Sequence, residues 1–234
     1  MLVAAPFTAR AQGYAPIVAA IRSGIRSGVY PGAVVVIGRS DTILFAGGYG
    51  HFTWKPSSTV PDPSITRWDL ASLTKVVATT GAMAMLVQQH RVDLDAPVSH
   101  YLPEYAGGRK SEVTVRMLLN HTSGMPAYVK LWELANTPAA ARQALFKVPL
   151  QRPPGASAVY SDLNAMLAGF VIERITGEPL DEFARSAVFQ PLGMLSTGYR
   201  PGAAVRPTVA PTGRFRGQPV GGTVNDRNAA TLGG

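Results

Sequence analysis

The pattern of apolar and polar positions divides the chain into a short sheet-forming part and a long helical part. Apolar residues recur at helical spacing over residues 14–25, which predicts a helix that Gly28 ends. A β-branched run at residues 33–38 is followed by a turn at residues 40–41 and a second extended run at residues 42–49. These runs predict an antiparallel hairpin.

Helical periodicity dominates the following part of the chain. Residues 72–90 are apolar or small around nearly the whole circumference of a helix, so we expect that helix to be buried centrally. Spacing and turn residues predict further helices at residues 92–102, 111–120, 137–146, 161–175 and 179–189. Residues 196–234 are rich in Gly, Pro and Arg, which predicts little regular structure.

This order of elements predicts an α/β (α+β) fold with a helix, a hairpin and a large helical region. A two-stranded hairpin is marginal alone, so we expect further strands beyond Gly234 to complete its sheet. We expect one domain over residues 13–234, with residues 13–70 as its sheet-side part and residues 71–195 as its helical part. Residues 1–12 are a disordered terminus or a signal-peptide remnant.

Composition narrows the classes of partner. The net charge is +8, but the 22 Lys and Arg residues are scattered, whereas a nucleic-acid-binding face concentrates them. No window reaches the ~18 consecutive apolar residues of a membrane span. There is no cysteine, no histidine pair at metal-binding spacing and no Gly-rich phosphate loop. We therefore expect no nucleic acid, no membrane span, no metal and no cofactor, and the oligomeric state is open.

The N-terminus leaves the localisation open. Residues 2–7 are apolar, and Ala9-Arg10-Ala11 resembles a small-x-small cleavage site, but a positively charged segment before them is missing. If Met1–Ala11 is the tail of a signal peptide, we expect a periplasmic or secreted protein. Otherwise we expect a cytoplasmic one.

Ser72 and Lys75 form an S-x-x-K pair at the start of the apolar helix. Residues three apart share one face of a helix, so the hydroxyl and the amine can meet. The helix N-terminus and burial both lower the pKa of a lysine, as a general base for a serine requires. The local sequence is equally compatible with a solvated Lys75 and with Ser72 as a helix cap.

Tyr160-Ser161-Asp162 lies between a Pro-Pro-Gly turn and an amphipathic helix. A tyrosine at this junction can direct its hydroxyl into a cleft, or it can be an interfacial side chain. In either case we expect Ser161 or Asp162 to cap the helix. Trp132 and Tyr128 are candidates for lining the cleft, although core or surface positions suit aromatic residues as well.

His121 follows a predicted helix and begins the sequence His-Thr-Ser-Gly. A Ser-His-Asp triad would recruit a histidine, but the chain contains no G-x-S-x-G elbow. Its position at a helix exit favours a structural turn over catalysis.

Three motifs in order carry a resemblance to a known family: S-x-x-K at residues 72–75, L-L-N-H-T-S-G at residues 118–124, and P-G-x-x-x-x-Y-S-D at residues 154–162. Together they resemble the β-lactamase-related, penicillin-recognising serine hydrolases. That superfamily includes class C β-lactamases, D-alanyl-D-alanine carboxypeptidases and family VIII esterases. The resemblance extends from about residue 13 to residue 234 and implies a β-lactamase/transpeptidase-like fold.

The resemblance also implies a chemistry. Ser72 would be a nucleophile that forms an acyl-enzyme, and its backbone N–H would be one oxyanion-hole donor. Lys75 and Tyr160 would share the transfer of the serine proton, with the identity of the base open. Asp162 would contact the substrate, which is expected to be a small-molecule ester, amide or D-amino-acid peptide. Trp132 is a further substrate-binding candidate from its position in the sequence alone.

Two departures from the family pattern change this expectation. Asp162 stands where the lactamases have asparagine, and its carboxylate should raise the pKa of Lys75. This favours the esterase or peptidase branch over β-lactamases. The third motif of the family, K-T-G or H-x-G, is absent from the sequence, so we expect it beyond Gly234. The alternative is a truncated, catalytically silent member or a ligand-binding remnant.

Overall fold

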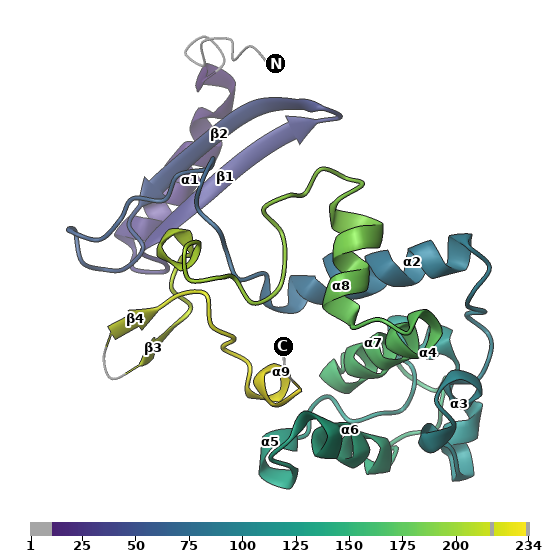
Figure 1. The fold of residues 1–234 in the computed structure, drawn as a ribbon. Coiled ribbons are helices and arrows are strands. Elements are labelled where there is room, and N and C mark those ends of the chain that lie inside the picture. The colour runs from purple at the N-terminus through teal and green to yellow at the C-terminus, as the bar shows by residue number, and fades with distance from the viewer. Residues whose placement is uncertain (1–10, 216–217, 233–234) are drawn as a thin grey trace. The chain divides into compact units, whose positions relative to one another are not determined.

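The computed structural model describes residues 11–215 and 218–232 and divides into two compact units (Figure 1). One unit contains the residues as far as Asp69 together with Pro201–Thr223. The other contains Leu70–Arg200 and the residues from Val224 onward. The segment interpreted as a signal-peptide remnant lies, apart from Ala11 and Gln12, outside the described residues.

The first unit contains the predicted helix and hairpin. Helix α1 (Ala15–Arg26) lies alongside the antiparallel hairpin of β1 (Gly32–Arg39) and β2 (Thr42–Gly50), as Figure 1 shows. The ring of Tyr14 lies 5.1 Å from that of Phe45 on β2. The helix and the hairpin were both predicted correctly, because their periodicities differ and turn residues separate them.

The same unit contains a second, smaller hairpin that the sequence did not predict. Strands β3 (Gly213–Phe215) and β4 (Gln218–Val220) pair antiparallel. An isolated parallel bridge joins Arg67 to Val209. Three-residue strands are too short to produce a recognisable alternation of apolar and polar residues.

The second unit is helical. It begins with a 3₁₀ turn (Ala71–Leu73) and a π-helical turn (Lys75–Thr80), which lead into α2 (Gly81–Gln88). The remaining helices are α3 (Val98–Tyr101), α4 (Val115–Leu119), α5 (Leu131–Leu134), α6 (Pro138–Lys147), α7 (Asp162–Thr176), α8 (Leu180–Ala184) and α9 (Arg227–Thr231). A π-helical turn (Arg185–Phe189) continues α8, and 3₁₀ turns lie at Pro103–Tyr105 and Gly108–Glu112.

Two predictions about these helices were wrong in part. The segment that begins at Ser72 is not buried on all sides: Ala82, Met83 and Leu86 are fully buried, but Val76 is 63% exposed. Residues 111–120 do not form one helix, because the backbone is extended at Val113 and Thr114. The Thr114 side chain accepts a hydrogen bond from the Met117 N–H and so caps a new helix, α4.

Helix α7 lies in the core of this unit and carries Asp162 at its first position. Leu163, Leu167 and Ile172 are fully buried on it, and each such side chain contributes about 1.5–3 kcal/mol relative to an exposed one. Gly177, with a φ of 76°, ends the helix as predicted.

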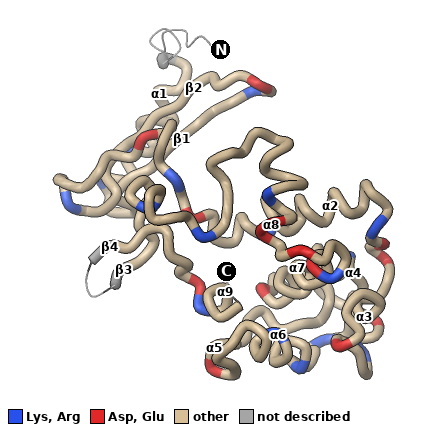
Figure 2. The backbone as a smooth tube through the Cα atoms, viewed as in Figure 1, with Lys and Arg blue, Asp and Glu red and all other residues tan. Residues whose placement is uncertain are grey.

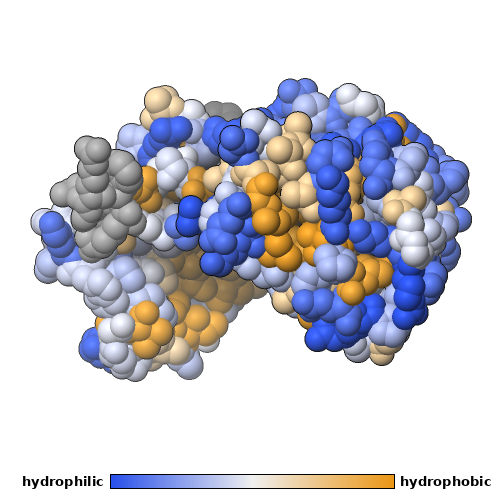
Figure 3. Space-filling model, turned by 90° about the horizontal axis from the view of Figure 1, so that it is seen from below, coloured by the Kyte–Doolittle hydropathy of each residue, from blue (hydrophilic) through white to orange (hydrophobic). Residues whose placement is uncertain are grey.

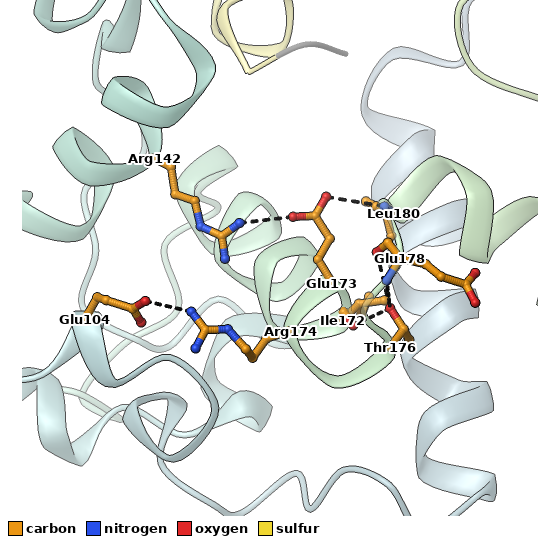
Figure 4. Close-up of polar contacts among 8 residues, drawn as sticks. All are labelled: Glu104, Arg142, Ile172, Glu173, Arg174, Thr176, Glu178 and Leu180. Atoms are coloured by element: carbon orange, nitrogen blue, oxygen red, sulfur yellow. Dashed lines mark hydrogen bonds and ion pairs between the residues drawn. The ribbon is translucent and has the colours of Figure 1, made fainter.

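Ion pairs fix the C-terminal part of α7 (Figure 4). Arg142 on α6 pairs with Glu173 at 3.2 Å, and Glu104 pairs with Arg174 at 2.6 Å. Glu173 also accepts a hydrogen bond from the backbone N–H of Leu180, the first residue of α8. These contacts hold in place the helix whose other end forms part of the site described below.

Charged residues occur along both units of the described chain and are not gathered on one element (Figure 2). On the face in Figure 3, hydrophobic residues reach the surface in patches between hydrophilic ones. Within the described ranges, no helix combines the length and the apolar character needed to cross a bilayer.

Candidate active site

The side chains of Ser72 and Lys75 meet at the start of the second unit. The Lys75 Nζ lies 2.9 Å from the Ser72 Oγ. The local backbone is irregular: Ala71, directly before Ser72, has a φ of 45°, and Lys75 begins the π-helical turn. A left-handed non-glycine residue and a π turn both recur at functional sites, where the surrounding packing holds them in place.

Asp162 and Tyr160 complete this group from a distant part of the sequence. The Lys75 Nζ lies 2.7 Å from the Asp162 Oδ1, and the two side chains are only 19% and 28% exposed. The same nitrogen lies 4.9 Å from the centre of the Tyr160 ring. The structure therefore brings together four of the five predicted site residues around one ammonium group.

Asp162 keeps Lys75 in its charged form. Burial is the largest single influence on Lys75 and lowers its pKa, but hydrogen bonds and opposite charge from Asp162 and Tyr160 outweigh it. The pKa of Lys75 is therefore raised, as expected for a carboxylate at this position. The expectation from burial and the helix N-terminus alone, a lowered pKa, was wrong.

Two loops hold Tyr160 and Asp162 in place through backbone hydrogen bonds. The Val159 N–H donates to the His121 carbonyl at 2.9 Å, and the Asp162 N–H donates to the Ala127 carbonyl at 3.1 Å. Ser161 occupies the N-cap position of α7, but its hydroxyl donates to the Pro126 carbonyl at 2.7 Å instead of capping the helix. The capping prediction for Ser161 was wrong because this tertiary bond competes with the local one.

His121 is at a turn, with a φ of 61°, and also contacts the site. Its ring lies 4.7 Å from the Tyr160 ring, and its Nδ1 accepts a hydrogen bond from the Ser161 N–H at 3.2 Å. Burial and the nearby Lys75 charge lower the pKa of His121, against a smaller opposing effect of Asp162. The imidazole therefore favours its neutral form.

Two buried polar residues behind His121 were not identified from the sequence. The Ser123 Oγ donates to the Asn164 Oδ1 at 2.6 Å, and the Asn164 Nδ2 lies 3.4 Å from the His121 Nδ1. Both residues are fully buried. The sequence did contain a signal for this pair: Asn164 lies on the apolar face of the helix predicted at residues 161–175, and a buried amide needs polar partners.

A cavity of about 110 Å³ opens beside the Ser72 hydroxyl. Its lining combines the reactive side chains with small and apolar ones: Ser72, Lys75, Val76, Thr79, Thr80, Leu118, Leu119, His121, Tyr160, Ala165 and Ala168. This volume accommodates a small group next to the nucleophile. A larger open hollow of about 410 Å³ shares no residue with this lining, and its Arg116 is paired with Asp95 at 2.7 Å.

Trp132 is placed differently from the other predicted site residues. It does not line the cavity beside Ser72. Its ring lies 5.8 Å from the Tyr128 ring and 4.6 Å from the Arg227 guanidinium carbon. A substrate contact for Trp132 stays a prediction.

Comparison with known proteins places these observations in a family context. A protein-family model described as Beta-lactamase matches residues 17–232. A protein of Escherichia coli K12 named "Putative D-alanyl-D-alanine carboxypeptidase" is 29% identical over 190 residues, covering 74% of this chain and 44% of the relative. The "N-acetylmuramyl-L-alanine amidase" of Bacillus subtilis 168 is 32% identical over 194 residues, covering 74% and 43%. The chain thus spans less than half the length of these relatives.

Solved structures show the same fold. A class C β-lactamase is 21% identical in sequence and superposes with a TM-score of 0.79. The match covers 95% of this chain and 61% of the β-lactamase chain. EstCE1, titled "a hydrolase with promiscuous acyltransferase activity", is 25% identical in sequence and has a TM-score of 0.69. The match covers 88% of this chain and 56% of the EstCE1 chain.

Proposed function

Because the chain belongs to the Beta-lactamase family, we propose that it supplies the nucleophile and the proton-transfer groups of a serine hydrolase that forms an acyl-enzyme on Ser72. The family and the β-lactamase/transpeptidase-like α/β fold agree with what the motifs predicted. The single observation that carries the proposal is the Lys75 ammonium within hydrogen-bonding distance of both Ser72 and Asp162.

In the proposed reaction, the Ser72 oxygen attacks the substrate carbonyl and loses its proton. Lys75 is held as an ammonium and has no lone pair to accept that proton, so we assign this role to the Tyr160 hydroxyl, whose oxygen accepts that proton as it gives up its own. The proton then passes to the leaving group as its bond to the carbonyl carbon breaks. Water repeats the sequence on the ester to Ser72 and releases the acid.

Lys75 has an electrostatic role in this scheme. Its positive charge lies 4.9 Å from the centre of the Tyr160 ring, whose face attracts a cation, and Asp162 fixes its position. The backbone N–H of Ser72 is assigned as one donor to the oxyanion of the tetrahedral intermediate.

The proposed substrate is a small ester, an amide or a D-amino-acid peptide, with esters and peptides favoured over β-lactams. An ionised Asp162 only accepts hydrogen bonds, so it cannot donate to a substrate carbonyl as an amide does. The relatives' names, a carboxypeptidase, an amidase and an acyl-transferring hydrolase, support the same range of acyl groups. The cavity of about 110 Å³ favours a small group beside Ser72.

The test is hydrolysis of a p-nitrophenyl ester and of a D-alanyl-D-alanine peptide by the protein as its gene encodes it. We expect Ser72→Ala to abolish turnover of both, and Lys75→Ala and Tyr160→Phe to slow it by about 10²–10⁴-fold. Ser111→Ala, an exposed serine in a 3₁₀ turn of the same unit, is the matched control and should leave the rate unchanged. Undiminished hydrolysis by Ser72→Ala would refute the proposal.

A further inference from the structure

A chain of buried hydrogen bonds determines the tautomer of His121. The Met125 N–H donates to the Ser123 Oγ at 3.1 Å, and the Ser123 hydroxyl donates to the Asn164 Oδ1 at 2.6 Å. The amide of Asn164 is thereby oriented with its Nδ2 towards the His121 Nδ1. His121 must therefore accept at Nδ1 and carry its hydrogen at Nε2.

A second donor gives the same result independently. The backbone N–H of Ser161 donates to the same Nδ1 at 3.2 Å, and a backbone N–H can never accept. Protonation at Nδ1 would break this bond and the bond from Asn164 together. Ser161 directly follows Tyr160, so the bond fixes the backbone on which the Tyr160 side chain is carried.

We propose that His121 is a positioning residue for Tyr160: its Nδ1 holds the Tyr160–Ser161 backbone, and its ring provides the surface against which the Tyr160 ring packs. This inference rests on the proposed function of Tyr160 as a proton acceptor. The supporting contacts are the 3.2 Å hydrogen bond and the 4.7 Å distance between the two rings. An error of about 1 Å in the position of a reacting group costs on the order of 10²-fold in rate.

The backbone of His121 adds a constraint on the residues that can replace it. Its φ of 61° lies in the left-handed region, which asparagine tolerates better than most residues. The Oδ1 of an asparagine is also the acceptor that comes closest to the position of the histidine Nδ1. Glutamine instead places its acceptor near the position of Nε2.

The charges around the imidazole of His121 predict how the reaction rate should depend on pH. The groups that face it are Lys75 from the π-helical turn, Asp162 and Asn164 from α7, and Tyr160 from the preceding loop. Lys75 opposes a second positive charge more strongly than Asp162 favours one, and burial opposes it as well. Acid conditions that protonate His121 should therefore release the Tyr160–Ser161 backbone and slow the reaction.

The first test reads the tautomer directly, without reference to activity. We expect ¹⁵N-detected NMR of the imidazole to show a neutral ring at pH 7, with a protonated Nε2 and an unprotonated Nδ1. We also expect it to titrate below the usual histidine pKa of about 6.5. A ring protonated at Nδ1, or a charged ring at pH 7, would overturn the inference.

The second test measures the rate of Ser72 labelling by a fluorophosphonate in the unaltered protein and in three variants. We expect His121→Ala and His121→Gln to slow labelling by about 10- to 100-fold. We expect His121→Asn to retain most of the labelling rate. The labelling rate of the unaltered protein should fall below about pH 6.5 as His121 is protonated, and that of His121→Asn should not. Thermal melts of all four proteins show whether a slow variant is still folded.

The outcomes separate the two proposals. No labelling of Ser72 in the unaltered protein would refute the proposed function. Labelling of the unaltered protein at the same rate as His121→Ala would refute the positioning role alone. A folded His121→Asn that is as slow as His121→Ala would also refute it, because that variant keeps an acceptor at the position of Nδ1.

Discussion

Replacing Asp162 by asparagine removes the negative charge beside Lys75 and preserves the size of the side chain. The cost depends on burial, because breaking a buried ion pair by removing one partner costs about 3–5 kcal/mol, and an exposed pair contributes about 0–1 kcal/mol. The two side chains are 19% and 28% exposed, which places this pair between the limits. Asp162 also begins α7, where a negative charge contributes about 0.3–1 kcal/mol.

We therefore expect Asp162→Asn to lower the free energy of unfolding by about 1–3 kcal/mol after solvent screening is taken into account. For a protein of this size that corresponds to a fall in Tm of roughly 2–12 °C. Urea denaturation and thermal melts at pH 7 measure both quantities.

The chain offers a matched control in Asp95→Asn. Asp95 pairs with Arg116 at the same 2.7 Å, but its side chain is 68% exposed and that of Arg116 is 52% exposed. Water screens this pair, so the control should cost clearly less than Asp162→Asn. An equal or larger loss for Asp95→Asn, or a gain in stability for Asp162→Asn, would refute the reasoning from burial.

The difference in the free energy of unfolding between Asp162→Asn and the unaltered protein should depend on pH in a definite direction. Because the folded-state pKa of Lys75 is raised, the stabilisation that the Lys75–Asp162 pair provides is fully present below the unfolded-state pKa of about 10.4. It is lost as the pH rises through the folded-state pKa. The difference in stability between the two proteins should therefore narrow in strongly alkaline solution, and a constant difference would contradict the assignment to Lys75.

Four further substitutions test the packing and the backbone of the helical unit by urea denaturation. Leu167→Ala, at a fully buried position of α7, should cost about 2–5 kcal/mol, and Leu195→Ala, at a position 83% exposed, should stay within about 0.5 kcal/mol. Gly177→Ala should cost about 1–2 kcal/mol, because its φ of 76° is left-handed and nothing lies near a new Cβ. Gly124→Ala should cost more, since its φ is 83° and a Cβ there would also collide with the Arg152 carbonyl oxygen.

Local patterns in the sequence were sufficient to predict the elements that neighbouring residues determine. The hairpin after Gly28 follows from a β-branched run, a turn and a second extended run, and the end of α7 follows from Gly177. The meeting of Ser72 and Lys75 follows from helical spacing. These features need no knowledge of distant contacts.

Features that depend on distant contacts could not be predicted in the same way. The hydroxyl of Ser161 bonds to Pro126, 35 residues away, rather than to its own helix. The Ser123–Asn164 bond joins residues 41 positions apart, and no single-sequence pattern pairs them. The raised pKa of Lys75 is different: the resemblance placed Asp162 beside Lys75 and so predicted the direction, and the 2.7 Å distance between the two groups explains it.

The most direct measurement of the central claim is peptide mass spectrometry of the protein after reaction with a fluorophosphonate. The account predicts one adduct, on the peptide that contains Ser72, and none in Ser72→Ala. An adduct on another serine, or labelling that persists in Ser72→Ala, would contradict it.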